Sequence, residues 1–473
     1  MKEPINISSR LEPLWDDFLI DREKTTAKRR LHQPVARELT AFDKPWLRGH
    51  NSPYMCLIQI DGVIRLYTMP KHGISVSESV DGRTWTHPEL GLVEFEGSKA
   101  NSIVYFDYSE TGFEPCGFDG FRVFIDGSPD CPENERIKAI ANMHSKLQLY
   151  VSEDGYYFRH RGAVPVNPVC ENTPYNSVNT VFYDTVTNTY KAFVRDYYTY
   201  HDGECIRAIS CGESPVLQPD GPWERSSFLK YDNDERWAMY INSVMPYYRA
   251  PHVYIGFPSR YVIHNSWGPV FEELCGRDAR RKRAGPDGSH RLGISVSDTQ
   301  FMVSRDGYDW IRYPDAFIRP GPEHPTNWIY GSVYFPNGIA QTPSWHPGCD
   351  DELSFWCMEN RFFTEQPPIL CHYTVRMDGF ASFASEYPSS RLVTKPIVFE
   401  GSELHVNMST SAWGSIVFRL RDAEGNTLGS APMFGDSVDK RVAFPEDISR
   451  FAGKPVTLEC DMRDCDLYSL RFE

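Results

Sequence analysis

The chain lacks the features that mark several large classes of protein. No apolar run is long enough to span a bilayer, and residues 1–6 lead into no apolar segment of a secretory signal. The twelve cysteines include no Cys-x-x-Cys pair, which argues against a zinc site or a disulfide framework. Lys and Arg (49) are outnumbered by Asp and Glu (64), and the net charge of −15 disfavours nucleic acid and anionic membranes as partners. We expect a cytoplasmic protein without metal or cofactor, and the sequence leaves its oligomeric state open.

Helical periodicity is almost as scarce, whereas strand-like runs are frequent. Runs such as 54–60, 148–151 and 253–257 are rich in Val, Ile, Tyr and Phe and are bounded by turn-forming residues. The best helix candidate is 271–283, whose basic cluster is typical of a solvated insertion. The pattern predicts an all-β protein.

One short motif, Ser-x-Asp-Gly-x-x-aromatic, occurs three times. The copies begin at Ser79, Ser152 and Ser304, so the second interval is about twice the first, and a degenerate copy at Ser210 falls in the gap. A fixed period of this length indicates a repeated supersecondary unit. Asp-Gly between apolar segments is a hairpin signal. A hairpin that recurs once per repeat predicts a β-propeller, in which Asp81, Asp154 and Asp306 cap their own turns.

The blades can be counted by their second strands. Five segments each follow a polar turn and an apolar strand: 65–67, 137–139, 190–193, 253–257 and 353–356. Five segments predict five blades, although a degenerate sixth blade would leave little trace. A boundary falls near 384–392, after which apolar and polar residues alternate. We therefore predict a propeller over residues 1–388 and a small β-sandwich over residues 389–473.

Several stretches carry a resemblance to a known superfamily. They are 15–21, 31–35, 86–98, 248–258, 377–382, 394–396 and 464–469. On these the chain resembles the five-bladed propeller glycoside hydrolases related to invertases and arabinanases, and within them a bacterial group of glycosyl hydrolases with a C-terminal β-sandwich. The resemblance implies a hydrolase that acts on an oligosaccharide. The Ser-x-Asp-Gly turns also resemble the Asp-boxes of sialidases, which are structural.

The sequence departs from the invertase pattern in two places. The Trp-x-Asn-Asp-Pro-Asn-like segment of the first blade and the Glu-Cys of the third blade are both missing, and Glu171 is only a distant substitute for the latter. Two alternatives therefore stay open. One is a sialidase-like or ulosonic-acid hydrolase, and the other is a carbohydrate-binding propeller without catalysis.

Site residues are predicted from propeller geometry, because inner strands begin at the ligand face and second strands return to it. Asp126 resembles the Asp that opens the second blade in this superfamily. Glycoside hydrolysis needs two carboxylates, and the candidates are Asp126, Glu359 and Asp196. We assign Glu359 as acid/base and Asp126 as nucleophile, base or pKa modulator. Candidate substrate-binding residues at the same face are Asn51, Asn179, Arg195, Asn242, Arg249, His252 and Arg260.

Arginines form a large part of this predicted set. Guanidinium groups bind carboxylates through two parallel hydrogen bonds, so a cluster of them suits an acidic sugar, although each could instead pair with a carboxylate of a neighbouring blade. A furanosidic sugar is the other substrate considered. Four aromatic residues could stack on sugar rings: Tyr175, Tyr247, Tyr248 and Trp328.

Overall fold

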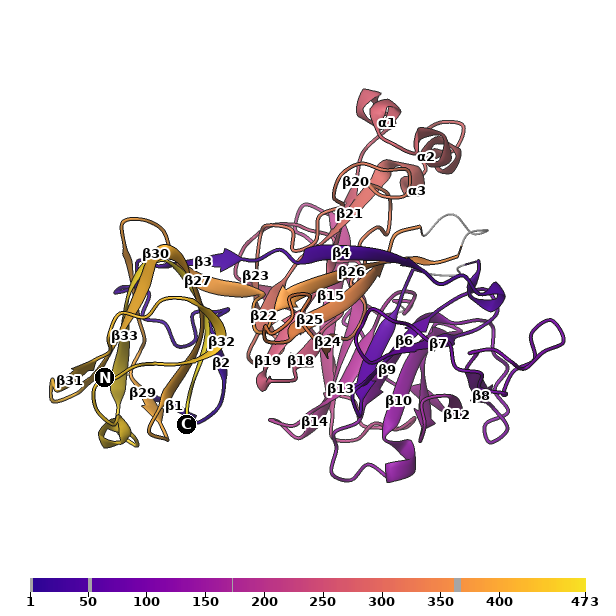
Figure 1. Cartoon of the computed structure of the whole chain (residues 1–473). Helices are drawn as coiled ribbons and strands as arrows, with labels where there is room; N and C mark the ends of the chain where they lie inside the picture. The colour runs from indigo at the N-terminus through magenta and orange to yellow at the C-terminus, as the bar shows by residue number, and fades with distance from the viewer. Residues whose placement is uncertain (1–2, 50–52, 172, 361–366) are drawn as a thin grey trace.

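The computed structural model describes residues 3–49, 53–171, 173–360 and 367–473. It contains two β units, a sandwich that holds both chain ends and a larger propeller beside it (Figure 1). Five separate blade sheets confirm the predicted five-bladed propeller followed by a β-sandwich. Within the described residues, none of the helices combines the length and the apolar character needed to cross a bilayer.

The inner strands of the five blades surround a common axis. They are β5 (Cys56–Ile60), β9 (Asp119–Ile125), β13 (Thr180–Asp184), β18 (Met245–Tyr247) and β24 (Ala340–Thr342). Contacts run from β24 to β5, β9, β13 and β18 in turn. Ser243, just before β18, donates to the carbonyl of Phe335, just before β24, at 3.1 Å and so links blades 4 and 5.

The other strands of each blade pair outward from the inner strand. Blade 1 adds β6 (Val63–Thr68) and β7 (Ser75–Ser79), and blade 2 adds β10 (Ile137–Met143), β11 (Lys146–Ser152), β12 (Tyr157–Val164) and β8 (Tyr105–Asp107). Blade 3 adds β14 (Thr189–Thr199), β15 (Cys205–Ser214) and β16 (Ser227–Phe228). Blade 4 adds β19 (Ala250–Gly256), β22 (Met302–Ser304), β23 (Asp309–Arg312) and β17 (Lys230–Tyr231), and blade 5 adds β25 (Glu352–Met358), β26 (Ile369–Arg376) and β4 (Val35–Ala41). All five predicted second strands are confirmed. The ring is closed by β4, an N-terminal strand that pairs with β26 of the last blade.

A helical insertion extends from blade 4. The hairpin of β20 (Ser259–Ile263) and β21 (Ser295–Thr299) carries α1 (Pro269–Glu273), α2 (Arg277–Ala284) and α3 (Arg291–Ile294), which project above the propeller (Figure 1). The predicted helix over 271–283 is split into α1 and α2. Gly276 separates them with a φ of +73°, and a Cβ there would lie 2.5 Å from the carbonyl oxygen of Pro325.

The sandwich sheet combines both ends of the chain. Its strands are β1 (Ile5–Ser8), β2 (Glu12–Pro13), β3 (Lys28–Leu31), β27 (Ala381–Ser385), β28 (Ser390–Val393), β29 (Ile397–Phe399), β30 (Leu404–Asp422), β31 (Thr427–Gly429), β32 (Asp436–Arg441) and β33 (Val456–Phe472). The first three pair with β29, β33 and β27, so residues 5–31 belong to this sheet, although the sequence grouped them with the propeller. The boundary near residue 388 stays a prediction about independent folding.

Buried polar contacts join the sandwich to blade 4. Asp378 has a fully buried side chain that accepts hydrogen bonds from Tyr247 at 2.5 Å and Ser469 at 2.9 Å, and Arg249 lies 3.1 Å away. Glu12, also buried, pairs with Arg305 of the β22–β23 turn at 2.8 Å. Because a buried carboxylate is costly without partners, these contacts hold the two units together.

Candidate active site

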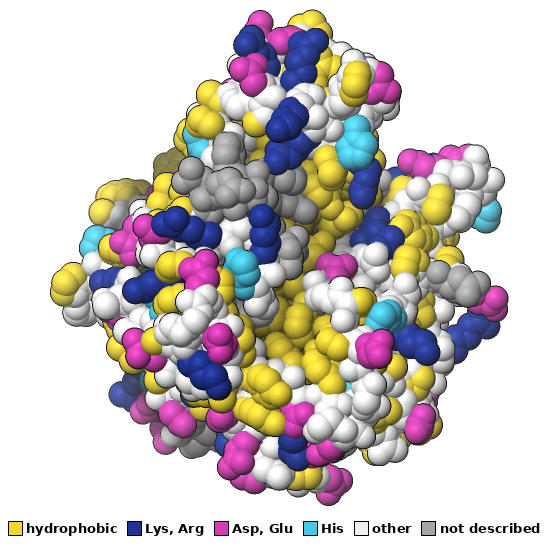
Figure 2. Space-filling view, turned by 90° about the vertical axis from the view of Figure 1, so that its right-hand side faces the viewer, with side chains coloured by type: hydrophobic (Ala, Val, Ile, Leu, Met, Phe, Trp, Pro, Cys, Tyr) yellow, Lys and Arg dark blue, Asp and Glu magenta, His cyan; other side chains and the backbone are white. Residues whose placement is uncertain are grey.

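A cavity of about 610 Å³ lies where the inner strands of the propeller begin. It is lined in every blade by the first residue of the inner strand or by the segment that precedes that strand: Tyr54, Asp119, Asn176, Tyr240 and Tyr330. We call this cavity the mouth. Figure 2 shows a hollow below the projecting helical lobe, with hydrophobic side chains in its depth and basic side chains near its rim.

Asp119 is the carboxylate among the described residues that line the mouth. It is the first residue of β9, and the adjacent Gly120 has a φ of +65° and touches the loop before blade 3, where a Cβ would lie 2.1 Å from the Ser177 carbonyl oxygen. Burial raises the pKa of Asp119, and the charges of Arg122, Arg195 and Arg207 offset this rise only in part. A carboxyl group with a raised pKa is suited to act as a general acid.

Two arginines of blade 3 stand side by side in the mouth. Arg195 on β14 and Arg207 on β15 both donate to the carbonyl oxygen of Asn176, at 2.5 and 3.3 Å. Both also donate to the hydroxyl of Tyr197. Burial raises the pKa of the Tyr197 phenol, but the two arginines outweigh burial, and its pKa is lowered overall.

The blade 4 insertion reaches the mouth through Arg291, the first residue of α3. The Arg291 guanidinium lies 5.7 Å from the ring centroid of Tyr330. Tyr330 and Tyr240 pack at 5.4 Å, and Tyr240 and Tyr334 stack at 6.0 Å. The described lining of the mouth therefore combines aromatic faces, which suit sugar rings, with three arginines and one aspartate.

The opposite face carries the Asp-Gly turns. Asp81 accepts from the amides of Arg83 and Thr84, both at 2.8 Å, and Asp154 and Asp306 repeat the pattern. Arg83 donates to the carbonyl of Pro343, just after the inner strand β24, and Lys191, near the start of β14, donates to that of Asp306. Both positions are at the strand ends remote from the mouth, as the sequence predicts for structural turns.

Asp126 lies on this opposite face, and its predicted place at the mouth is wrong. It follows the last residue of β9, and seven strand residues separate it from the mouth, a span of roughly 20 Å. Its fully buried side chain is bonded to Lys138 and accepts from Tyr190 at 2.7 Å. The neighbouring blade repeats this device, because Tyr254 donates to Asp184 at the end of β13. Asp126 therefore joins two blades.

Arg249 and His252 are also remote from the mouth, contrary to expectation. The inner strand of blade 4 is the short β18, which ends at Tyr247, so Arg249 lies in the turn to β19. Arg249 faces Asp378, and His252 lies 3.3 Å from Glu12. Both contact the sandwich. Tyr247 and Tyr248 belong to the same end of blade 4 and do not line the mouth.

Three further predicted residues organise loops around the mouth. Asp196 is fully buried and accepts from the amides of Val169, Cys170 and Tyr197. Asn179 and Asn242, both buried, bond backbone groups of β14 and of the segments before the inner strands of blades 3 and 4. The polar atoms of these side chains already form hydrogen bonds with backbone groups. We therefore assign these residues to positioning the loops, since they have few polar atoms left to bind a ligand.

Glu359 follows β25, which runs antiparallel to the inner strand and so returns to the mouth face. Burial raises its pKa, whereas His324, whose Nε2 lies 3.1 Å from Oε2, lowers it. Glu359 does not line the mouth cavity itself.

Arg260 pairs with Asp298 at 2.6 Å at the base of the insertion, and Asn51 lies outside the described residues. Neither Tyr175 nor Trp328 lines the mouth. The predicted site residue that does line it is Arg195.

The sequence reasoning missed Asp119, Arg207 and Arg291. Asp119 precedes the run 120–125, which is apolar apart from Arg122, so the rule for residues that open an inner strand selects Asp119 once that strand is placed. Arg207 alternates with Ile209 and Cys211 on β15, which places the three side chains on one face of the strand. No signal in the sequence marks Arg291, because an insertion brings it to the mouth.

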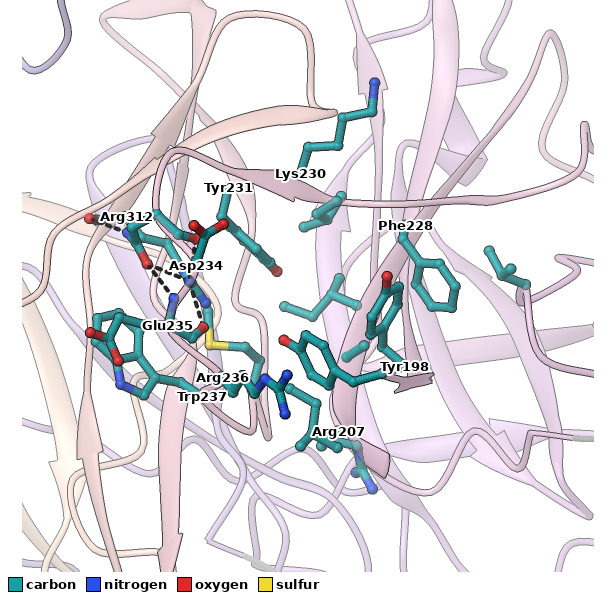
Figure 3. Close-up of a pocket in the computed structure, with 18 of the residues that line it drawn as sticks. Tyr198, Arg207, Phe228, Lys230, Tyr231, Asp234, Glu235, Arg236, Trp237 and Arg312 are labelled. Atoms are coloured by element: carbon teal, nitrogen blue, oxygen red, sulfur yellow. Dashed lines mark hydrogen bonds between the residues drawn. The ribbon is translucent and has the colours of Figure 1, made fainter. Parts of the chain in front are cut away.

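A second hollow, of about 800 Å³, lies between blades 3 and 4 (Figure 3). Tyr198 and Phe228 face it from one side, and Trp237 and Arg312 from the other, while Arg207 lies at its edge. We call it the side hollow. Its Arg236 pairs with Asp202 and Glu204, the latter at 2.8 Å.

Within the described residues, no three His, Cys, Asp or Glu side chains gather into a group that could hold a metal ion.

Comparison with known proteins adds little to this description. No family model matches the sequence, and no curated protein matches it. Among solved structures, a fructofuranosidase from Schwanniomyces occidentalis complexed with fructosylnystose aligns over 93% of this chain and 99% of its own, with 11% identity and a TM-score of 0.37. An exo-inulinase from Aspergillus awamori aligns over 94% and 99%, with 11% identity and a TM-score of 0.38.

An arabinoxylan arabinofuranohydrolase of glycoside hydrolase family 43 from Bacillus subtilis aligns over 89% and 78%, with 10% identity and a TM-score of 0.31. Scores this low do not assign an activity to this chain.

Proposed function

We propose that this protein is a glycoside hydrolase whose active site is the propeller mouth. The observation that carries the proposal is a half-buried carboxyl group with a raised pKa, Asp119, set among the aromatic rings of Tyr54, Tyr197, Tyr240 and Tyr330. Such rings suit the faces of a sugar, and such a carboxyl suits protonation of a glycosidic oxygen. An oligosaccharide is the substrate class that these groups fit.

Glycoside hydrolysis requires a second carboxylate, and we propose Glu359 for it. Glu359 lies on the mouth face of blade 5, while Asp119 opens blade 2, and both blades adjoin blade 1. The geometry of the faces supports Asp119 and Glu359 as the pair, in place of the predicted pair Asp126 and Glu359. Their separation in a substrate complex would indicate the stereochemical outcome: about 5–5.5 Å for retention and about 6.5–9.5 Å for inversion.

A panel of aryl glycosides tests this proposal. The native protein should hydrolyse at least one member, and Asp119→Asn should lower kcat by at least about 100-fold, the contribution of a general acid. Glu359→Gln should lower it comparably. Arg260→Gln, at the base of the insertion and outside the mouth, serves as the control and should leave kcat unchanged. An Asp119→Asn variant with full activity would remove Asp119 from the mechanism.

Two observations favour other functions. The lowered pKa of the Tyr197 phenol, held between two arginines, favours hydrolysis of ulosonic acids, for which tyrosine is a known type of nucleophile. The presence of one carboxylate among the described mouth-lining residues favours a carbohydrate-binding propeller without catalysis. Activity confined to a ulosonide would support the first, and sugar binding without turnover of any panel member would support the second.

A further inference from the structure

The mouth holds positive charge that is not paired with a carboxylate within the described part of the chain. Arg195, Arg207 and Arg291 line it against Asp119 alone among the described residues. No carboxylate of the described chain lies within 4.0 Å of any of these three guanidinium groups. The whole chain has a net charge of −15, so a local excess of arginines that have no carboxylate partner among the described residues is a feature of this site and not of the composition.

The paired arginines are held close together by shared acceptors. Each donates to the Asn176 carbonyl and to the Tyr197 hydroxyl, while the Nε atoms of both are buried without an acceptor. Burial and the neighbouring Arg207 charge lower the pKa of Arg195. Two adjacent cations repel each other, and an anion placed between them would offset that repulsion.

We propose that the Arg195–Arg207 pair, with Arg291 from the blade 4 insertion, is a subsite for the carboxylate of an acidic sugar. Arginine forks match a carboxylate through two parallel hydrogen bonds, and the tyrosines beside them provide faces for the sugar ring. The insertion thus helps to define the substrate, because it adds Arg291 to a subsite whose other two arginines come from blade 3. This inference rests on the proposed function of the mouth and narrows its substrate class.

Binding of monosaccharides to the intact protein tests the subsite without requiring hydrolysis. Calorimetric titrations would compare glucuronate, galacturonate and N-acetylneuraminate with neutral glucose and galactose. At least one acid should bind about tenfold or more tightly than the neutral sugars. The uronates and the ulosonate form separate arms, so the result also distinguishes the two acid classes.

Variants of the pair give the sharper measurement. Arg207→Gln should weaken binding of the acid by about 10- to 100-fold, the effect of losing hydrogen bonds to a charged group, and leave neutral sugars unaffected. Arg207→Lys keeps the charge but loses the planar fork, so it should give an intermediate loss. Arg236→Gln is the matched control, since it lines the side hollow and not the mouth, and it should bind as the native protein does.

The thermal midpoint provides an independent readout. Removing one of two adjacent cations should leave the midpoint of the unliganded Arg207→Gln variant equal to or above that of the native protein. Equal binding of acidic and neutral sugars, no binding of any acid, or an Arg207→Gln variant that binds the acid normally would overturn the subsite. Binding of an acid without turnover would support the subsite and contradict hydrolysis. Turnover of neutral glycosides alone would support hydrolysis and contradict the subsite.

Discussion

At the scale of single residues, two aspartates at the ends of one strand have different roles. Asp119 opens β9 at the mouth, where it is surrounded by arginines and half-buried, whereas Asp126 follows β9 on the opposite face, where it is bonded to Lys138 and Tyr190. Asp126 is bonded to a buried cation and stabilises the fold. Asp119 has a pKa that is raised by burial, and its carboxyl group is therefore available for proton transfer.

Replacement of Asp126 by Asn should therefore reduce stability and spare activity. The change leaves Lys138 as a buried cation without a carboxylate, which costs about 3–5 kcal/mol, and chemical denaturation would measure the loss. The fraction that remains folded should keep the native kcat. A double variant, Asp126→Asn with Lys138→Met, should recover part of the stability. A stable but inactive Asp126→Asn protein would contradict this assignment.

Asp119→Asn should have the opposite effect on stability. A carboxyl with a raised pKa in the folded state stabilises the protein most below its unfolded pKa, and that contribution is lost as the pH rises through the folded pKa. At pH 7 the variant should thus unfold at a higher temperature than the native protein, and the difference should disappear near pH 3. Thermal scans across this range provide the test, and a variant that is less stable at pH 7 would contradict the stated environment.

At the scale of elements, the Ser-x-Asp-Gly turns each stabilise one hairpin. In the turn from β22 to β23, Ser304 accepts from the Gly307 amide at 2.9 Å, and Asp306 accepts from two further amides. The turns of blades 1 and 2 repeat these contacts. The period of the motif therefore reports a structural requirement of the blades and carries no information about the substrate.

Replacing Asp306 with Ala should cost about 1–2 kcal/mol of stability, comparable to the loss of a capping side chain. The kcat on any hydrolysed glycoside should not change, since the turn faces away from the mouth. Asp81→Ala and Asp154→Ala provide matched repeats of the experiment in blades 1 and 2. A selective loss of kcat in any of the three would place that turn in the catalytic machinery.

The positions of the strands could be predicted from the sequence better than which end of each strand lies at the mouth. The five second strands were found because each pairs an apolar run with a polar turn. Arg249 and His252 were misplaced because they were grouped with the residues that open the inner strand of blade 4, whereas β18 has only three residues and ends at Tyr247, before both of them. Asp126 was misplaced because its resemblance to the Asp that opens the second blade set it before an inner strand, whereas it follows β9. Arg291 depends on an insertion whose path the sequence does not define.

At the scale of the whole molecule, N-terminal segments of the chain pair with strands of both the sandwich and the propeller. Residues 5–31 complete the sandwich, and β4 then closes the propeller. Glu12 links residues 5–31 to blade 4 through its ion pair with Arg305. Burial raises its pKa, but the hydrogen bond to His252 and the charges of Arg305 and Arg10 outweigh burial and lower the pKa of Glu12 to about 2.

This low pKa predicts a specific response to acid. A lowered carboxyl pKa gives stability that is complete above the unfolded value, near 4.5, and is lost as the pH falls towards about 2. Glu12→Gln should therefore cost on the order of 3 kcal/mol at pH 7 and flatten the dependence of stability on pH between about 5 and 2. Equal pH dependence in the native and variant proteins would contradict the contribution of this cluster.

Truncation after Leu392 should also disrupt the whole molecule. It removes β33, the strand with which β2 and β27 pair, and it exposes the apolar core that Phe383 and Leu392 share with the C-terminal strands. We expect loss of solubility, measured by the fraction recovered after centrifugation. A stable, monomeric and selectively inactive product would instead mean that a sandwich residue reaches the mouth.

The most direct test of the central claim is a crystal structure of the Asp119→Asn variant soaked with an acidic oligosaccharide. The account predicts that a sugar ring occupies the mouth, with its carboxylate at Arg195 and Arg207 and a glycosidic oxygen within hydrogen-bonding distance of residue 119. Sugar density confined to the side hollow, or to the face that carries the Asp-Gly turns, would contradict it.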